Sequence, residues 1–187
     1  MELARYNRTA VTFHWLVAIG ILTNIALAWI WPYMADASVR PAINLHKSIG
    51  ITVLGLAVMR LLWRLTHRPP ALPTGYQRWE VGLAHATHWL LYLLIFAMPL
   101  SGWIFDSAWK DAPQNPLMLF GLFEFPRIGF IEHLAPDVKD RIHQAGENAH
   151  GLFAKFIYAL VALHVLGALK HQFLDGKAEL QRMWFGR

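Results

Sequence analysis

The segment 150–171, HGLFAKFIYALVALHVLGALKH, combines a long apolar sequence with three histidines. Lys155 is the only charge in its apolar middle, so the segment predicts a hydrophobic helix, in which an ionisable side chain is costly and usually functional. His150 and His164 are fourteen residues apart, close to four helical turns, so they project from about one face roughly 21 Å apart along the axis. Imidazole is a good axial ligand for haem iron, and this spacing suits two haem irons at two depths of one membrane.

The composition predicts a membrane protein and excludes several kinds of redox centre. Of the 187 residues, 56% are hydrophobic and only 16% are charged, whereas a soluble domain carries about 25% charge. The chain has no cysteine, which excludes disulfides, Cys-ligated iron–sulfur clusters, thiolate-ligated haem and covalently attached c-type haem. The net charge of +5 accompanies continuous apolar sequence, so we interpret the basic residues as topology signals and expect no nucleic-acid partner.

Four apolar segments are long enough to cross the hydrocarbon core of a bilayer, which needs about 20 residues. They are about 11–31, 42–64, 81–105 and 147–173. The expected fold class is all-α, an integral membrane four-helix bundle, with residues 1–187 forming a single transmembrane domain. A cleaved signal peptide is an alternative interpretation of the first segment, but this segment is longer than the usual apolar core and contains His14.

The connections between the spans carry the charges that predict orientation. A proline-rich linker at 66–78 joins the second and third spans, and an outer loop at 106–146, expected to fold over the bundle mouth with short helices, joins the third and fourth. The side with the termini and the linker carries ten basic and four acidic residues, and the other side seven basic and eight acidic. The positive-inside rule then predicts cytoplasmic termini in a multi-pass protein of the bacterial inner membrane.

This topology converts position along the chain into depth in the membrane. His46 and His150 each lie near the start of a span that enters from the outer side, so they can face each other across one haem. His14 lies near the inner surface and His164 lies deeper along the fourth span, so these two can flank a second haem. Two imidazoles fill both axial positions of an iron, which leaves no open site for oxygen and suits electron transfer.

Other interpretations of the buried histidines stay open at this point. His85 and His88 also lie on the inner side, and the spacing does not decide whether His14 or His88 pairs with His164. A single histidine in a membrane helix can equally be a packing residue, a proton relay or a pore liner. Four histidines at two matched depths form the stronger signal.

The chain resembles the bacterial cytochrome b561 family of four-helix di-haem membrane proteins, over about residues 11–185. Each short motif is weak alone, but their order and spacing are specific. The segments that carry the resemblance are FHWL at 13–16, LHKSIG at 45–50, RLLWR at 60–64, LAHATH at 83–88, His150, LH at 163–164 and ALKH at 168–171.

The resemblance implies that His14 and His164 hold an inner haem b and that His46 and His150 hold an outer one, with these histidines as the iron ligands. It implies electron transfer between the quinone pool, with ubiquinone as substrate or bound ligand, and a donor or acceptor at the outer surface. Some members oxidise periplasmic superoxide. The outer side has one more acid than base and would repel superoxide, although residues such as Lys47 can form a local positive funnel.

Three further residues near the expected haems are candidates for contacts with quinone or haem propionates. Lys47 can pair with an outer propionate, or can be an ordinary interfacial lysine. His171 follows His164 by seven residues on nearly the same face, so it can bond a quinone carbonyl or deliver a proton, or can be a solvated histidine. His88 is a quinone or propionate partner, or a packing residue.

Two classes of function follow. The favoured one is a di-haem b oxidoreductase or electron carrier linked to quinone, either acting on superoxide or serving a periplasmic protein as a cytochrome b subunit. The rival is a redox-silent membrane protein whose histidines carry a metal or protons as a transporter or small channel. A reduced-minus-oxidised visible spectrum separates the two classes.

Overall fold

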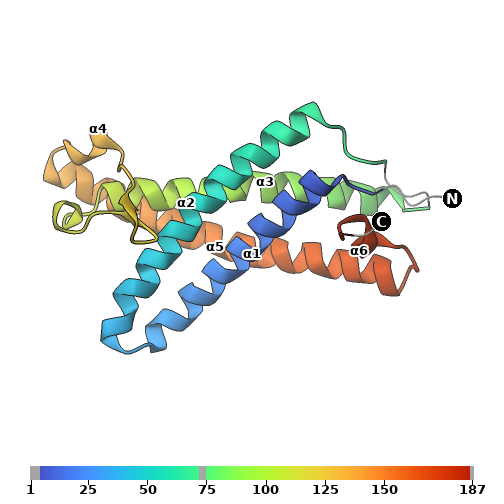
Figure 1. Ribbon diagram of the computed structural model, residues 1–187, viewed down its shortest axis with the longest axis horizontal. Helices are drawn as coiled ribbons and strands as arrows, with labels where there is room; N and C mark the ends of the chain where they lie inside the picture. Colours follow the sequence, from blue (N-terminus) through green and yellow to red (C-terminus); the bar gives the residue numbers. More distant parts are fainter. Residues whose placement is uncertain (1–4, 72–74, 186–187) are drawn as a thin grey trace.

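Four long helices form an elongated bundle in the computed structural model, which describes residues 5–71 and 75–185 (Figure 1). All four are long and apolar enough to cross a membrane, and most of their large apolar side chains are exposed on the outside of the bundle. Exposed apolar helix surface of this extent suits contact with lipid, not water. The expected all-α membrane bundle is thereby confirmed. The helices are α1 (Arg8–Ile30), α2 (Asp36–Thr66), α3 (Arg78–Ser107) and α5 (Pro136–Phe173).

Local sequence signals set where these helices begin. The side chain of Asn7 accepts a hydrogen bond from the Ala10 amide at 2.8 Å and caps α1. At the start of α3, Gln77 and Glu80 form a reciprocal capping box, which satisfies two amides that have no partner inside the helix. α5 begins with Pro136 at its first position, where the missing N–H of proline has no cost.

The bundle consists of two antiparallel helical pairs, α1 with α2 and α3 with α5. Two glycines allow the close approach within each pair. A Cβ at Gly20 would lie 2.5 Å from a methyl of Val53, and a Cβ at Gly146 would lie 2.7 Å from the Cβ of Phe105. Small residues at such crossings are the usual way in which membrane helices pack. The pairs meet in a small core that contains Val17, Val53, Ala57 and Ile95.

The connection between α3 and α5 is more structured than the sequence predicted. α5 begins at Pro136, so residues 136–146 of the expected loop are helical. A small antiparallel hairpin, which the sequence did not predict, pairs Met118 with Glu124 and Leu119 with Phe123. The elements of this connection are η2 (Ala112–Gln114), β1 (Met118–Leu119), β2 (Phe123–Glu124) and α4 (Gly129–Glu132).

The two ends of the bundle differ, and we name them by what they carry. The loop end carries the α3–α5 connection and the turn between α1 and α2, which contains η1 (Trp31–Tyr33) (Figure 1). The termini end carries the start of α1 and the short helix α6 (Glu179–Arg182). The buried Arg182 side chain donates to the carbonyl oxygens of Pro70 and Ala71, and the Trp15 indole donates to Met183 O at 2.7 Å. These bonds fix the C-terminal segment against the other elements of the termini end.

Candidate functional site

Two histidine pairs lie inside the bundle at different positions along α5. The rings of His46 on α2 and His150 on α5 have centroids 6.2 Å apart, towards the loop end. The rings of His14 on α1 and His164 on α5 have centroids 6.1 Å apart, towards the termini end. α5 thus contributes one imidazole to each pair, and all four side chains are half-buried.

The separation within each pair fits one metal ion held between two imidazoles. A histidine nitrogen binds a metal at about 2 Å, and its ring centroid lies about 1 Å further back, so two axial rings on one metal have centroids about 6 Å apart. Both pairs are edge-to-face, and other edge-to-face ring contacts of the described residues are somewhat closer, as in Trp31 with His46 at 5.2 Å and Trp15 with Trp184 at 5.7 Å. The geometry of both pairs therefore fits an iron porphyrin with two histidine ligands.

The loop-end pair is supported by polar groups that orient its imidazoles. His150 Nδ1 lies 3.1 Å from Met98 O and 3.1 Å from Ser101 Oγ. A proton held on Nδ1 by these oxygens leaves Nε2 with the lone pair that a metal needs, as is usual for metal-bound histidine. Gly102 leaves room for this ring, since a Cβ there would lie 3.3 Å from His150 Cε1.

His46 has a different environment on the other side of the pair. Asn24 on α1 donates through its amide nitrogen to the His46 carbonyl oxygen at 3.2 Å. Within the described part of the chain, His46 Nδ1 and Asn24 Oδ1 are the buried side-chain atoms without a hydrogen-bond partner. Unsatisfied polar atoms are rare in folded proteins and call for an explanation, for which a bound group or water is a common one.

The termini-end pair lies in a cluster with a third histidine and an arginine. The ring of His88 on α3 has its centroid 5.3 Å from that of His164, closer than the His14–His164 separation. His88 is also exposed, whereas His14 and His164 are half-buried. An Arg60 guanidinium nitrogen lies 3.4 Å from His14 Nδ1, which places a positive charge beside this pair. Because two axial ligands of one metal need centroids about 6 Å apart, and because His88 is exposed, the geometry favours His14 over His88 as the partner of His164.

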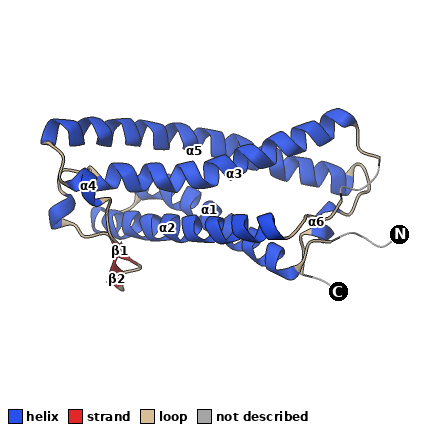
Figure 2. Cartoon of the chain, turned by 90° about the horizontal axis from the view of Figure 1, so that it is seen from above, coloured by secondary structure: helices blue, strands red, loops and turns tan. Residues whose placement is uncertain are grey.

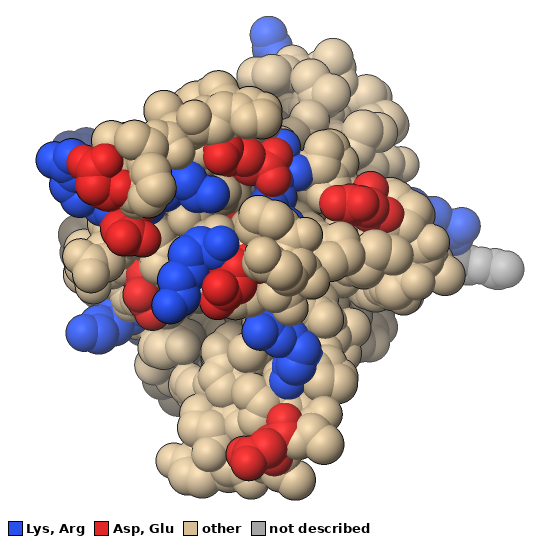
Figure 3. Space-filling model, turned by 90° about the vertical axis from the view of Figure 1, so that its left-hand side faces the viewer, with Lys and Arg blue, Asp and Glu red and all other residues tan. Residues whose placement is uncertain are grey.

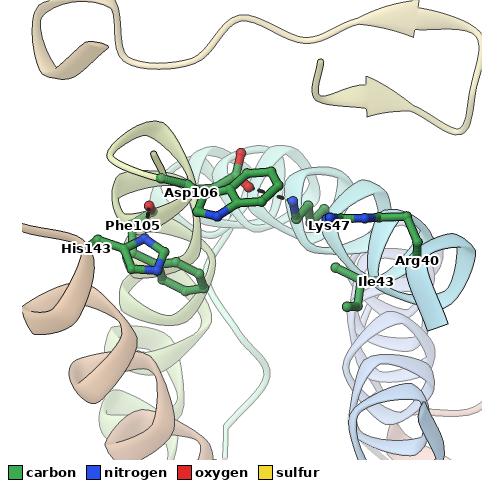
Figure 4. Close-up of a pocket in the computed structure, with 7 residues that line it drawn as sticks. Arg40, Ile43, Lys47, Phe105, Asp106 and His143 are labelled. Atoms are coloured by element: carbon green, nitrogen blue, oxygen red, sulfur yellow. Dashed lines mark hydrogen bonds and ion pairs between the residues drawn. The ribbon is translucent and has the colours of Figure 1, made fainter. Parts of the chain in front are cut away.

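A cavity of about 170 Å³, lined by residues that include Phe105 and Asp106, opens at the loop end (Figure 4). Arg40 and Lys47 on α2 line one side, and both cations lie over the ring of Trp109. His143 on α5 lines the other side and has its Nδ1 2.8 Å from the Phe105 carbonyl oxygen. Its ring contacts the Phe105 ring edge to face, and Phe105 contacts the His150 ring in the same way. The cavity therefore approaches the His46–His150 pair to within one aromatic side chain.

An acid-rich cluster surrounds His171 at the termini end. His171 Nδ1 lies 2.6 Å from Asp175 Oδ2, and Lys170 Nζ lies 2.5 Å from Glu80 Oε1 and 2.8 Å from Asp175 Oδ2. Hydrogen bonds from Lys170 and then from His171 hold the pKa of Asp175 below its ordinary value of 3.8. Ligand atoms of Glu80, His171 and Asp175 are close enough to hold a metal ion, but the Lys170 ammonium already lies between the two carboxylates.

Tyr76 covers His171 from the linker between α2 and α3. The two rings have centroids 4.6 Å apart, and the Tyr76 hydroxyl donates to the Glu179 carboxylate. Burial, and then the hydrogen bond to this carboxylate, raise the pKa of Tyr76, so the hydroxyl stays protonated as a donor. His171 is therefore enclosed by an aromatic ring and a carboxylate and is not freely solvated.

Several residues of these sites have no signal in the sequence. Ser101, Asn24 and Asp106 meet their partners across helices, and no spacing within one helix predicts such contacts. His85 is exposed and, within the described residues, makes no hydrogen bond or ring contact with either pair. The sequence, in contrast, places His46, His150 and His164 by depth along the spans, and the family resemblance selects His14 as the partner of His164.

Four apolar helices that enclose facing histidine pairs suit a membrane cytochrome of the b type. The chain belongs to the prokaryotic cytochrome b561 family, because residues 5–186 match the family described by that name. It is a bacterial multi-pass membrane protein that binds haem b and transfers electrons. The resemblance found in the sequence motifs is thereby confirmed.

Relatives match along nearly their whole length. "Cytochrome b561 homolog 2" of Escherichia coli (strain K12) is 34% identical over 182 residues, which cover 96% of this chain and 90% of the relative. "Probable superoxide oxidase CybB" of Yersinia pestis is 29% identical over 187 residues, 96% of this chain and 95% of the relative. "Cytochrome b561 homolog 1" of Escherichia coli (strain K12) is 24% identical over 183 residues.

Proposed function

We propose that the chain is a di-haem b electron carrier of the bacterial inner membrane, a single transmembrane domain with cytoplasmic termini. His14 and His164 would hold one haem b, and His46 and His150 the other. Haem b supplies a one-electron redox centre when bound. The observation that carries the proposal is the equal centroid separation of the two pairs, 6.1 Å and 6.2 Å, on partners that share α5.

The charge distribution supports the orientation. In this topology the termini end faces the cytoplasm, because its flanks carry the larger excess of lysine and arginine. The loop end then faces the periplasm, with His46 and His150 as the outer ligands. This orientation brings the cavity lined by Arg40 and Lys47 to the periplasmic surface.

The chain's own residues orient and isolate the two centres. Met98 O and Ser101 Oγ hold the proton of His150 on Nδ1, which directs Nε2 towards the metal position. Arg60 places a positive charge beside the inner pair, where it can compensate a haem propionate. The four histidine side chains are half-buried between the helices, which limits their contact with water.

We propose a quinone, ubiquinone in particular, as the electron partner at the inner end. His171 lies at that end of α5, bonded to Asp175 and covered by the Tyr76 ring. Imidazole exchanges protons near neutral pH, so His171 can take up a proton from the cytoplasmic surface, and the ionised carboxylate of Asp175 orients the ring and stabilises its protonated form. His171 would bond a quinone carbonyl and deliver this proton when the quinone is reduced, with His88 beside the inner pair as a second contact.

Superoxide is the outer electron donor that we propose. The cavity at the loop end suits a small anion through Arg40, while Lys47 on the same wall is paired with Asp106, which also lines the cavity. The His46–His150 pair lies behind Phe105. A relative that matches 96% of this chain is a probable superoxide oxidase, which supports the same substrate class. Superoxide would lose one electron to the outer centre and leave as dioxygen, and two such electrons would reduce one quinone to quinol with two protons.

A periplasmic protein is the second candidate for the outer partner. The loop end displays lysine and arginine side chains interleaved with aspartate and glutamate, without a uniform positive field (Figure 3). Alternating charges of this kind suit docking with a complementary protein surface. In this role the chain would be a cytochrome b subunit, and Lys47 would contact a haem propionate or the partner.

Haem stoichiometry and kinetics test these proposals. The purified protein should contain two haem b per chain and show a b-type α-band in the reduced-minus-oxidised spectrum. A single haem per chain would refute the pairing. Rapid-mixing experiments should show faster reduction of the outer haem by superoxide than by quinol, and the Arg40→Gln variant should slow the superoxide phase alone. Reduction by quinol but not by superoxide would favour the cytochrome b subunit.

A further inference from the structure

The hairpin β1–β2 exposes large apolar side chains at the loop end. Phe120, Leu122 and Phe123 are 49%, 78% and 54% exposed, respectively. Figure 2 shows that the hairpin projects sideways from the bundle, past α2, and not along the long axis of the helices. An element that extends sideways from a membrane bundle runs along the plane of the membrane.

The contacts of the hairpin with α2 determine its depth. The Phe120 amide donates to Ser48 Oγ at 2.9 Å, and Ser48 Oγ donates to Met118 O at 3.2 Å. Ser48 follows His46 by two residues and lies about 18 Å along the helix from Asp36. The hairpin tip therefore lies at the level of the His46–His150 pair, about 9 Å along α2 from the expected start of the span at residue 42.

The backbone of the hairpin is suited to an apolar environment. In hydrocarbon, every peptide N–H and C=O needs a partner inside the protein. β1 and β2 pair with each other, the Leu122 amide donates to Leu119 O at 3.0 Å, and the Phe125 amide donates to Leu117 O at 2.7 Å. The Phe120 amide at the tip uses the Ser48 hydroxyl instead.

The residue at the tip also favours apolar surroundings. Phe120 has φ +50° and is followed by Gly121 at φ +73°. Turns with two consecutive positive φ values favour asparagine, aspartate or glycine, because a bulky side chain is strained there. Phe120 is 49% exposed, so in water little burial of its ring would offset the strain of this backbone conformation. Contact with acyl chains would bury the ring and offset the strain.

A groove of about 380 Å³ separates the hairpin from α2. The lining from the helix consists of Pro41, Asn44, Leu45 and Ser48, and the lining from the hairpin consists of Met118, Phe120 and Gly121. Glu124, the charge within the paired strands, lies at the base of the hairpin beyond the apolar tip.

We propose that the hairpin is a re-entrant element that inserts its tip into the leaflet on the side of the His46–His150 pair. Leu122 and Phe123 contact the acyl chains of lipids, and the groove beside α2 receives one acyl chain. The inserted hairpin shields the outer histidine pair from water on the α2 side. This inference needs only the membrane class of the protein and holds whichever electron donor is correct.

Site-directed spin labelling tests this proposal, because the chain contains no cysteine. Leu122→Cys carries a nitroxide label in holoprotein reconstituted into phospholipid vesicles. Gln114→Cys, an exposed position of the same connection outside the hairpin, is the matched control. Power saturation measures collisions of each label with dioxygen, which concentrates in lipid, and with a water-soluble nickel chelate.

The proposal predicts that the Leu122 label collides mainly with dioxygen and the Gln114 label mainly with the nickel chelate. Equal access of the chelate to both labels would place the hairpin in water and overturn the proposal. Protection of the Leu122 label from both reagents would show that protein covers the hairpin, which also overturns it. Since Leu122 is 78% exposed, the labelled variant loses no packing contact, and an unchanged haem spectrum verifies that it is folded.

Discussion

Lys47 Nζ lies 2.5 Å from Asp106 Oδ1, which joins the residue after a proposed haem ligand to a nearly buried carboxylate. The second oxygen of Asp106 accepts a hydrogen bond from Arg127 Nε at 2.9 Å. Arg127 in turn donates to the carbonyl oxygens of Ala112 and Asn115. One carboxylate thus holds α2, α3 and the α3–α5 connection together over the outer histidine pair.

The Asp106→Asn variant should lose stability, because two cations lose their partner and the Arg127 side chain is only 5% exposed. Breaking a buried ion pair on one side costs on the order of 3–5 kcal/mol. Thermal unfolding in detergent measures the loss. Asp111→Asn, in the same connection but exposed, is the control and should leave the unfolding temperature unchanged.

The same variant should raise the midpoint potential of the outer haem and leave that of the inner haem unchanged. Without the carboxylate, the positive charge of Lys47 favours the reduced iron more strongly. A redox titration followed in the visible spectrum measures both potentials. A parallel shift of both haems would indicate a general structural effect and would contradict a local role for Asp106.

Alanine at a proposed ligand should remove one haem and keep the other. His46→Ala and His150→Ala should lose the outer haem, and His14→Ala and His164→Ala the inner one, each with about half the haem absorbance. His88→Ala should retain both haems. His88 is exposed, and its ring centroid lies 5.3 Å from that of His164, which is less than the about 6 Å expected for two axial ligands of one iron. Loss of the inner haem in His88→Ala with retention in His14→Ala would reverse the assignment.

Ser101→Ala should retain the outer haem but bind it more weakly. The serine hydroxyl lies 3.1 Å from His150 Nδ1, and removal of such an outer-shell partner typically costs 10–100-fold in metal affinity. Transfer of haem to an apo-protein acceptor measures the rate of loss. Ser101→Thr keeps the hydroxyl and should restore the native rate, which a purely steric role of the serine would not predict.

Gly146→Ala should separate α3 from α5. A Cβ at this position would lie 2.7 Å from the Phe105 Cβ and 3.4 Å from its backbone, so the helices must shift at a cost of about 1–3 kcal/mol. Gly167 lies on the same helix with nothing within 4 Å of the added Cβ, and Gly167→Ala should be neutral or slightly stabilising. Unfolding temperatures of the two variants provide the comparison.

Asp175 should contribute stability at neutral pH and lose this contribution in acid. Its pKa is lowered by Lys170 and His171, so the contribution is complete above the ordinary value of 3.8 and disappears as the pH falls through the lower value in the folded protein. The difference in unfolding temperature between the native chain and Asp175→Asn should therefore persist from pH 7 to about pH 5 and be lost in stronger acid. A difference that vanishes between pH 7 and pH 5 would contradict this pairing.

The fold class could be predicted because each helix carries its own signal, a run of apolar residues long enough for a membrane. The depths of His150 and His164 were equally visible, since they lie on one helix, but the choice of His14 over His88 as a partner came from the family resemblance and not from spacing. The extension of α5 to Pro136 was missed because residues 136–146 are polar and helical outside the apolar span. The Asp106 bridges and the hairpin on Ser48 depend on packing between distant segments, which hydropathy does not report.

α5 supplies one ligand to each proposed centre, and this has a mechanical consequence. With two haems bound as proposed, the distance between their irons would be set largely by the fourteen-residue spacing of His150 and His164 on this one helix. Movements of α1 or α2 would loosen one coordination bond, but they would leave the distance for electron transfer between the two haems nearly constant. Deformation of the surrounding bilayer would therefore change the rate of electron transfer between the two haems only slightly.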